Sequence, residues 1–192
     1  PVRGREGENG LLCWYGIPYG AAPTGESRWT APQEPARWHT VRDCTRPAPA
    51  ACQYTTFPLG TEDCLTLDVC SSSDAKKRPV LVYLHGSAAT GSSLELPGCE
   101  LVRDAGCVFV ALNYRLGLFG WNCLPALTSG PDSTGNFALL DIARALDWVR
   151  DNICRFGGDA DNITLGGFSD GGRMAAALAG RPLFRGRFRQ AA

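Results

Sequence analysis

The sequence lacks the features of a protein that spans a membrane or binds nucleic acid. No 18 apolar residues run together, and the longest apolar stretches, residues 80–84 and 108–112, have the length of buried strands. Basic and acidic side chains number 19 each, so no net charge attracts a nucleic acid or an anionic membrane. We therefore expect a globular chain with no membrane span and no nucleic-acid partner. Its 192 residues suffice for one domain with a sizeable core.

Signatures of a metal, dinucleotide or phosphate site are also missing. The nine cysteines lie at positions 13, 44, 52, 64, 70, 99, 107, 123 and 154. No two have C-x-x-C spacing, which argues against a zinc site or a thioredoxin-type motif and favours buried free thiols with one or two disulfides. No G-x-G-x-x-G occurs, and Ser92 stands where a phosphate loop that begins at Gly86 requires lysine. We expect no cofactor and no metal.

The composition of the chain changes near residue 79. Residues 1–78 are rich in Pro, Trp, Gly and Arg, which favours turns and short antiparallel strands. In residues 79–192, strand-like and helix-like segments alternate, as in a parallel sheet covered by helices. The predicted strands cover residues 80–84, 108–114 and 162–166, and the predicted helices cover 139–153 and 173–178. The expected fold class is α/β, with a mostly parallel central sheet and flanking helices.

Ser169 lies in a G-x-S-x-G pattern between the third predicted strand and the helix that follows. In this context the serine is on a strained turn, the nucleophile elbow, which projects its hydroxyl above the sheet. Small residues are needed at Gly167 and Gly171, because a Cβ at either position would meet the neighbouring strand and helix. The bare pattern is weak in a chain with 23 glycines, and its place after a strand makes Ser169 the candidate nucleophile.

A serine nucleophile of this kind requires an oxyanion hole built from backbone N–H groups. The loop that follows the first predicted strand begins at His85 and offers Gly86, Ser87 and Ala88 as donors. Asp170, the residue after the candidate nucleophile, is expected to supply a further N–H. Which of the three loop residues donate stays open at this point.

Further motifs lie between Gly16 and Leu165. They are residues 16–19, 28–29, 62–69, 113–117, 135–136, 140–141, 145–149, 152–153, 156–159 and 162–165. In order and spacing they resemble the N-terminal part of the type-B carboxylesterase and cholinesterase-like family of α/β-hydrolases. The resemblance implies the N-terminal part of an α/β-hydrolase fold. It also implies hydrolysis of small-molecule carboxylic esters through an acyl-enzyme on Ser169.

The resemblance also implies structural roles for several other residues. One disulfide and two ion pairs are expected: Cys52 with Cys64, Arg28 with Glu62, and Arg115 with Asp141. His85 is expected to shape the oxyanion loop, and His39 to be solvated.

Both histidines precede Ser169, whereas the triad of α/β-hydrolases follows the order Ser, acid, His. We therefore expect an N-terminal fragment that lacks the triad acid and histidine and is inactive alone.

Ser87 and Ala88 replace glycines of the family's loop, and Asp170 replaces a small residue. The alternative is a catalytically inactive cholinesterase-like binding or adhesion domain. The retained Ser169 favours the esterase, because a non-catalytic module has no need of a strained serine.

Overall fold

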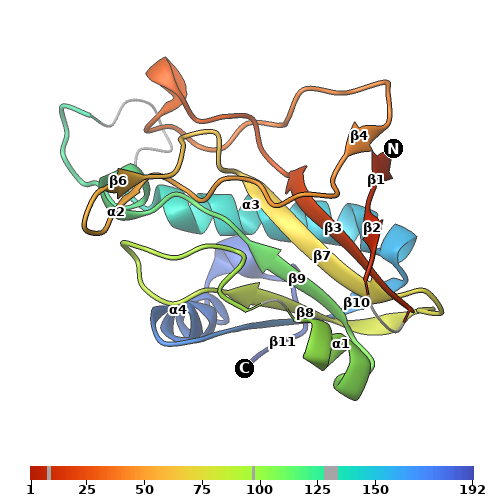
Figure 1. The fold of residues 1–192 in the computed structure, drawn as a ribbon. Coiled ribbons are helices and arrows are strands. Elements are labelled where there is room, and N and C mark those ends of the chain that lie inside the picture. Colours follow the sequence, from red (N-terminus) through yellow and green to blue (C-terminus); the bar gives the residue numbers. More distant parts are fainter. Residues whose placement is uncertain (8–9, 97, 128–133) are drawn as a thin grey trace.

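The computed structural model describes residues 1–7, 10–96, 98–127 and 134–192. In these residues it has a central mixed sheet of seven strands. Their order across the sheet is β11-β10-β8-β9-β7-β3-β2 (Figure 1). Their bounds are β2 Arg5–Glu6, β3 Leu11–Pro18, β7 Thr66–Ser72, β8 Arg78–Leu84, β9 Val108–Leu112, β10 Gly158–Gly167 and β11 Gln190–Ala191. Two smaller pairs are β1 Val2–Arg3 with β4 Arg42–Asp43, and β5 Gln53–Tyr54 with β6 Pro58–Leu59.

The three strands predicted after residue 79 are β8, β9 and β10, and they form the parallel centre of the sheet. β8 pairs in parallel with both neighbours and places Val82 opposite Val110 on one side and Leu165 on the other. All three side chains are fully buried. β9 ends at Leu112, two residues before its predicted end, and β10 begins at Gly158, four residues before its predicted start. The α/β class is confirmed.

Residues 1–78 contribute two long strands to this same sheet. β3 pairs antiparallel with β7, and β7 pairs antiparallel with β9. β7 is almost wholly buried, although Thr66, Asp68 and Ser71 are polar. The Asp68 carboxylate accepts hydrogen bonds from the Gly16 N–H and the Ser93 hydroxyl, each at 2.7 Å, which offset the cost of its burial. Because these residues are polar, neither the composition nor the apolar periodicity of the sequence indicates a buried strand here.

The helix predicted over residues 139–153 is α3, Phe137–Asn152, which lies behind the sheet in Figure 1. Its Ile142 and Leu146 are fully buried in the main core with the side chains of the parallel strands. A 3-10 turn, Ile153–Phe156, follows α3 and ends at Gly157. Gly157 has a φ of 83°, a left-handed conformation that favours glycine, so it turns the chain into β10.

A short helix, α1 Cys99–Ala105, covers the opposite face of the sheet. Side chains alternate along β8, so that Val82 belongs to the main core and Tyr83 to a second cluster with Phe109 and Val102 of α1. No element is predicted here from sequence, because α1 is too short for a clear apolar stripe.

The remaining elements follow the parallel strands. α2 Gly117–Gly120 comes after β9, and α4 Asp170–Leu178, predicted over residues 173–178, comes directly after β10 and contacts β10 and β8. β11 pairs with β10 at only two positions, Thr164 and Leu165. Among the described residues no helix is both long and apolar enough to cross a bilayer.

The two expected ion pairs are present and tie the N-terminal segment to the sheet. Buried Arg115 binds Asp141 in a bidentate manner, with N–O distances of 2.6 and 2.9 Å. It also donates to the backbone carbonyls of Arg28 (3.0 Å) and Thr30 (2.9 Å). Arg28 in turn donates to both carboxylate oxygens of Glu62, at 2.5 and 2.8 Å. The segment around Arg28 is thereby fixed to the chain that follows β9 and to α3.

Candidate active site

Ser169 lies at the sharp turn between the end of β10 and the start of α4. Its φ of 54° and ψ of −116° are rare for a residue with a side chain and store backbone strain. Its side chain is exposed. This is the backbone geometry expected of a nucleophile elbow.

The glycines on either side of Ser169 allow the turn to press against the end of β8. A Cβ on Gly167 would lie 2.6 Å from the Leu84 carbonyl oxygen, and a Cβ on Gly171 would lie 2.1 Å from the same atom. Both distances are far below an ordinary contact, so the expected requirement for small residues is confirmed. The elbow consequently abuts the loop that follows β8.

The loop after β8 and the elbow are brought together, as the sequence predicts. A Cβ built on Gly86 would lie 3.6 Å from the Ser169 Cβ and 3.3 Å from the ring of Phe168. The Phe168 N–H donates to the carbonyl of Leu84 at 3.3 Å. The loop after β8 therefore lies directly beside Ser169.

The four expected oxyanion donors differ in availability. The Gly86 N–H donates to Glu95 Oε1 at 3.1 Å, which makes it less available to an oxyanion than the other three. Within the described part of the chain, the N–H groups of Ser87 and Ala88 have no protein acceptor. Asp170 is the first residue of α4, where N–H groups have no intrahelical acceptor. Ser87, Ala88 and Asp170 therefore remain the candidate donors.

Ser87 sets the shape of the loop. Its φ is 63°, again a left-handed conformation, and its hydroxyl accepts hydrogen bonds from the N–H groups of Ala89 (3.1 Å) and Thr90 (3.2 Å). These bonds close a tight turn, so the side chain is directed into the loop's own backbone. Replacement of a family glycine by Ser87 is accommodated in this way.

Glu95 is a site residue that sequence reasoning missed. Its Oε1 accepts the Gly86 N–H and also the Tyr83 hydroxyl, each at 3.1 Å. Burial and the hydrogen bond to Glu95 raise the pKa of Tyr83 to about 12, so Tyr83 remains a donor. Glu95 belongs to no motif and lies in a loop, which leaves no local signal for its role. It fixes the start of the candidate oxyanion loop to β8.

His85 is buried beneath the same loop. Its ring stacks on Tyr114 with centroids 4.4 Å apart, and its Nδ1 lies 2.9 Å from the carbonyl oxygen of Gly86. The Tyr114 hydroxyl donates to the His85 carbonyl at 3.0 Å. Burial lowers the pKa of His85, which keeps the imidazole neutral. These contacts place His85 where it supports the loop.

Among the described residues, no histidine hydrogen-bonds the Ser169 hydroxyl. His39 is exposed and lies outside any helix or strand, and neither it nor His85 hydrogen-bonds Ser169. A base for the candidate nucleophile is therefore not found among the described residues.

The Asp170 carboxylate pairs with Arg173 one turn along α4, at 3.1 Å. The positive end of the helix dipole and the Arg173 guanidinium both offset its negative charge. The repulsion that Asp170 would exert on a developing oxyanion at Ser169 is thereby reduced.

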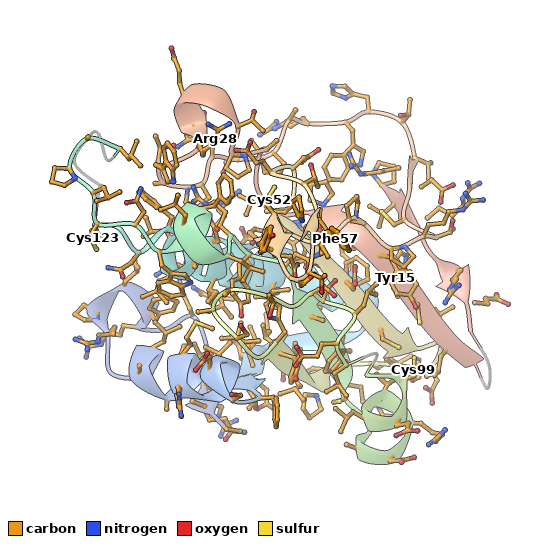
Figure 2. The ribbon with its side chains drawn as sticks, turned by 60° about the vertical axis from the view of Figure 1, so that its left-hand side comes forward. Tyr15, Arg28, Cys52, Phe57, Cys99 and Cys123 are labelled. Carbon is orange, nitrogen blue, oxygen red and sulfur yellow. The ribbon has the colours of Figure 1, made fainter. Side chains whose placement is uncertain are left out.

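The expected disulfide between Cys52 and Cys64 is not formed in the structure, where all nine cysteines are free thiols. Burial raises the pKa of both thiols. Figure 2 shows Cys52, Cys99 and Cys123 in separate parts of the molecule. The pairing of Cys52 with Cys64 stays a prediction.

A cavity of about 530 Å³ lies beside the candidate oxyanion loop. Its lining includes Gln53, Tyr54, Leu59, Ala89, Leu118 and Phe119. The Gln53 side chain exchanges two hydrogen bonds with the backbone of Gly91, at 2.9 and 3.0 Å, which joins the cavity wall to the loop. The lining is largely apolar and suits an uncharged organic group.

The parallel strands, the strained serine turn and the adjoining loop together define an α/β-hydrolase. A family model described as "Carboxylesterase family" matches residues 1–192, and the chain belongs to this family. Para-nitrobenzyl esterase of Bacillus subtilis (strain 168) is 40% identical over 96% of this chain and 40% of its own length. Carboxylesterase 3B of Mus musculus is 36% identical over 99% of this chain and 37% of its own length.

A solved structure titled "PNB ESTERASE" has the same fold. It superposes with a TM-score of 0.91 at 40% identity, covering 99% of this chain and 41% of its own chain. The chain thus spans about two fifths of the length of the relatives it matches.

Proposed function

We propose that this chain is the N-terminal part of a serine carboxylesterase that hydrolyses small-molecule carboxylic esters. The observation that carries the proposal is the backbone of Ser169, which holds φ 54° and ψ −116° beside the loop at Gly86. Such strain persists where surrounding structure enforces it, and it is concentrated at functional sites. Membership of the carboxylesterase family supports the same reaction.

In the proposed mechanism, Ser169 Oγ attacks the ester carbonyl carbon and loses its proton to a base. The carbonyl oxygen becomes an oxyanion that accepts hydrogen bonds from the N–H groups of Ser87, Ala88 and Asp170. The C–O bond to the alcohol then breaks, and the alcohol leaves with the proton. Water attacks the acyl-enzyme in the same way, releasing the carboxylic acid and restoring the Ser169 hydroxyl.

The base and the acid that orients it are assigned to a part of the protein outside this chain. Neither His39 nor His85 hydrogen-bonds Ser169, and the chain spans only about two fifths of the length of the matched relatives. The chain alone is therefore expected to be inactive. In the complete protein, the cavity beside Gln53 and Phe119 receives an apolar part of the ester.

The reading frame downstream of Ala192 supplies a first test. A Glu or Asp followed by a Gly-flanked His supports the proposal, and their absence from a complete frame contradicts it.

Hydrolysis of a short-chain p-nitrophenyl ester by the complete protein is the second test. We expect turnover that Ser169→Ala abolishes and Ser92→Ala retains. We also expect no turnover by the 192-residue chain alone, and turnover there that depends on Ser169 would refute the assignment of the base.

A catalytically inactive binding domain is the alternative function. It is favoured by the Gly86 N–H, which Glu95 engages, and by the carboxylate of Asp170 beside the candidate site. Ester turnover by the complete protein that Ser169→Ala removes would exclude it.

A further inference from the structure

Three thiols from distant parts of the chain converge on the face of the sheet that α1 covers. Cys13 is on β3, Cys70 is directly opposite it on β7, and Cys99 is the first residue of α1. The sulfur of Cys70 is 3.4 Å from that of Cys13 and 3.7 Å from that of Cys99. All three sulfurs lie within 4.8 Å of one another.

These separations are close to those of thiolates that share one metal ion. Sulfurs bound to Zn²⁺ at about 2.3 Å with tetrahedral angles lie roughly 3.8 Å apart. Two of the observed separations are already within about 0.4 Å of this value, and the third needs to shorten by no more than about 1 Å. The three sulfurs therefore approximate one face of a tetrahedron.

The residues around the three cysteines suit a negatively charged site with one metal ion. A divalent ion with three thiolates carries one net negative charge, and Arg5, opposite Cys13 in the pairing of β2 with β3, supplies a positive charge beside it. Its guanidinium lies 5.0 Å from the ring of Tyr15 and donates to the Tyr15 hydroxyl at 3.2 Å. Figure 2 shows Tyr15 and Cys99 on the same side of the molecule. Groups of this kind around a metal site stabilise its charge and orient its ligands.

A cavity of about 170 Å³ borders two of the three cysteines, Cys13 and Cys70. Arg5, Cys13, Tyr15 and Cys70 are part of its lining. It provides an entry path for an ion and room for a solvent molecule as the fourth ligand, which a three-sulfur site leaves open.

We propose that Cys13, Cys70 and Cys99 form a binding site for one thiophilic metal ion, with Zn²⁺ as the ion whose geometry they fit. Binding releases the proton of each of the three thiols and forms one metal–sulfur bond to each sulfur. A disulfide between Cys13 and Cys70 would leave Cys99 unexplained, whereas a metal ion uses all three sulfurs. The cysteines are 57 and 29 positions apart, so no spacing motif reveals them.

The site is tested on the full chain after reduction and removal of metal, by titration with Zn²⁺ against a chromophoric chelator. We expect one ion per chain. Cys99→Ser, the least buried of the three positions, should weaken binding about tenfold or more, whereas the matched control at exposed Cys123, Cys123→Ser, should leave it unchanged. No uptake, uptake that survives Cys99→Ser, or equal loss in both variants would each overturn the proposal.

X-ray absorption at the zinc edge of the loaded wild-type chain needs no variant. We expect three sulfur neighbours at about 2.3 Å. A shell of nitrogen and oxygen alone would contradict the site.

Discussion

The N–H of Gly86 donates to Glu95 Oε1 at 3.1 Å, and this bond fixes the start of the loop that faces Ser169. The same oxygen accepts the Tyr83 hydroxyl of β8, so one carboxylate links the loop to the sheet. Loss of this link would let the N–H groups of Ser87 and Ala88 move away from the oxyanion position.

Glu95→Ala is therefore expected to lower kcat of the complete protein about tenfold or more toward a p-nitrophenyl ester, with a smaller change in KM. Glu95→Gln keeps an acceptor oxygen and should retain most of kcat. Glu100→Ala, an exposed carboxylate on α1, is the matched control. Equal activity of Glu95→Ala and the control would show that the loop does not depend on this bond.

A second prediction concerns the contact of the elbow with β8. Gly171→Ala places a Cβ 2.1 Å from the Leu84 carbonyl oxygen and should destabilise the chain by about 1 to 3 kcal/mol. Gly180→Ala has no atom within 4 Å of the new Cβ and is the control. Urea unfolding monitored by circular dichroism measures both. Indistinguishable midpoints would contradict the packing described for Gly171.

A third prediction concerns the buried pair of Arg115 and Asp141. Asp141→Ala leaves the guanidinium of Arg115 buried without its counter-ion, which should lower the free energy of unfolding by about 3 to 5 kcal/mol. Asp104→Ala breaks an exposed pair with Arg103 and should change it far less. Chemical unfolding under identical conditions compares the two variants, and similar losses would argue against a structural role for the buried pair.

A fourth prediction concerns pH. Burial lowers the pKa of His85 in the folded chain, where Tyr114 stacks on the ring, and Glu95 opposes the shift. In the unfolded chain the pKa of this histidine has its ordinary value of about 6.5. The unfolded state thus binds the proton more readily. Stability from the neutral ring is present above about pH 6.5 and is lost as pH falls below it.

The free energy of unfolding should therefore fall less steeply between about pH 7.5 and 5.5 in His85→Gln than in the wild type. His39→Gln, at an exposed position, is the control and should keep the wild-type slope. A slope in His85→Gln that matches the wild type would contradict the burial argument.

The sequence predicts the parts of the fold whose signal is local. β8, β9, β10 and α3 appear where apolar runs or a helical stripe predict them, and the turn at Ser169 follows from its glycines. β7 was not predicted, because Asp68 and Ser71 look like surface residues until Gly16, Ser93 and the carbonyl of Phe156 satisfy them.

The parts of the site that escaped prediction depend on contacts between distant segments. Glu95 acts on Gly86 across a loop, and Cys13 meets Cys70 only because β3 and β7 pair in that register. Such contacts leave no trace in spacing or composition. The availability of the Gly86 N–H could not be judged from sequence for the same reason.

The most direct test of the account is covalent labelling of Ser169 in the complete protein by a fluorophosphonate ester. The serine oxygen displaces fluoride, and the adduct is located by mass spectrometry of peptides. The account predicts one adduct, on Ser169, which Ser169→Ala removes and Ser73→Ala, at an exposed serine away from the site, leaves in place. An unlabelled protein, or an adduct on another serine that persists in Ser169→Ala, would contradict the assignment of Ser169 as the nucleophile.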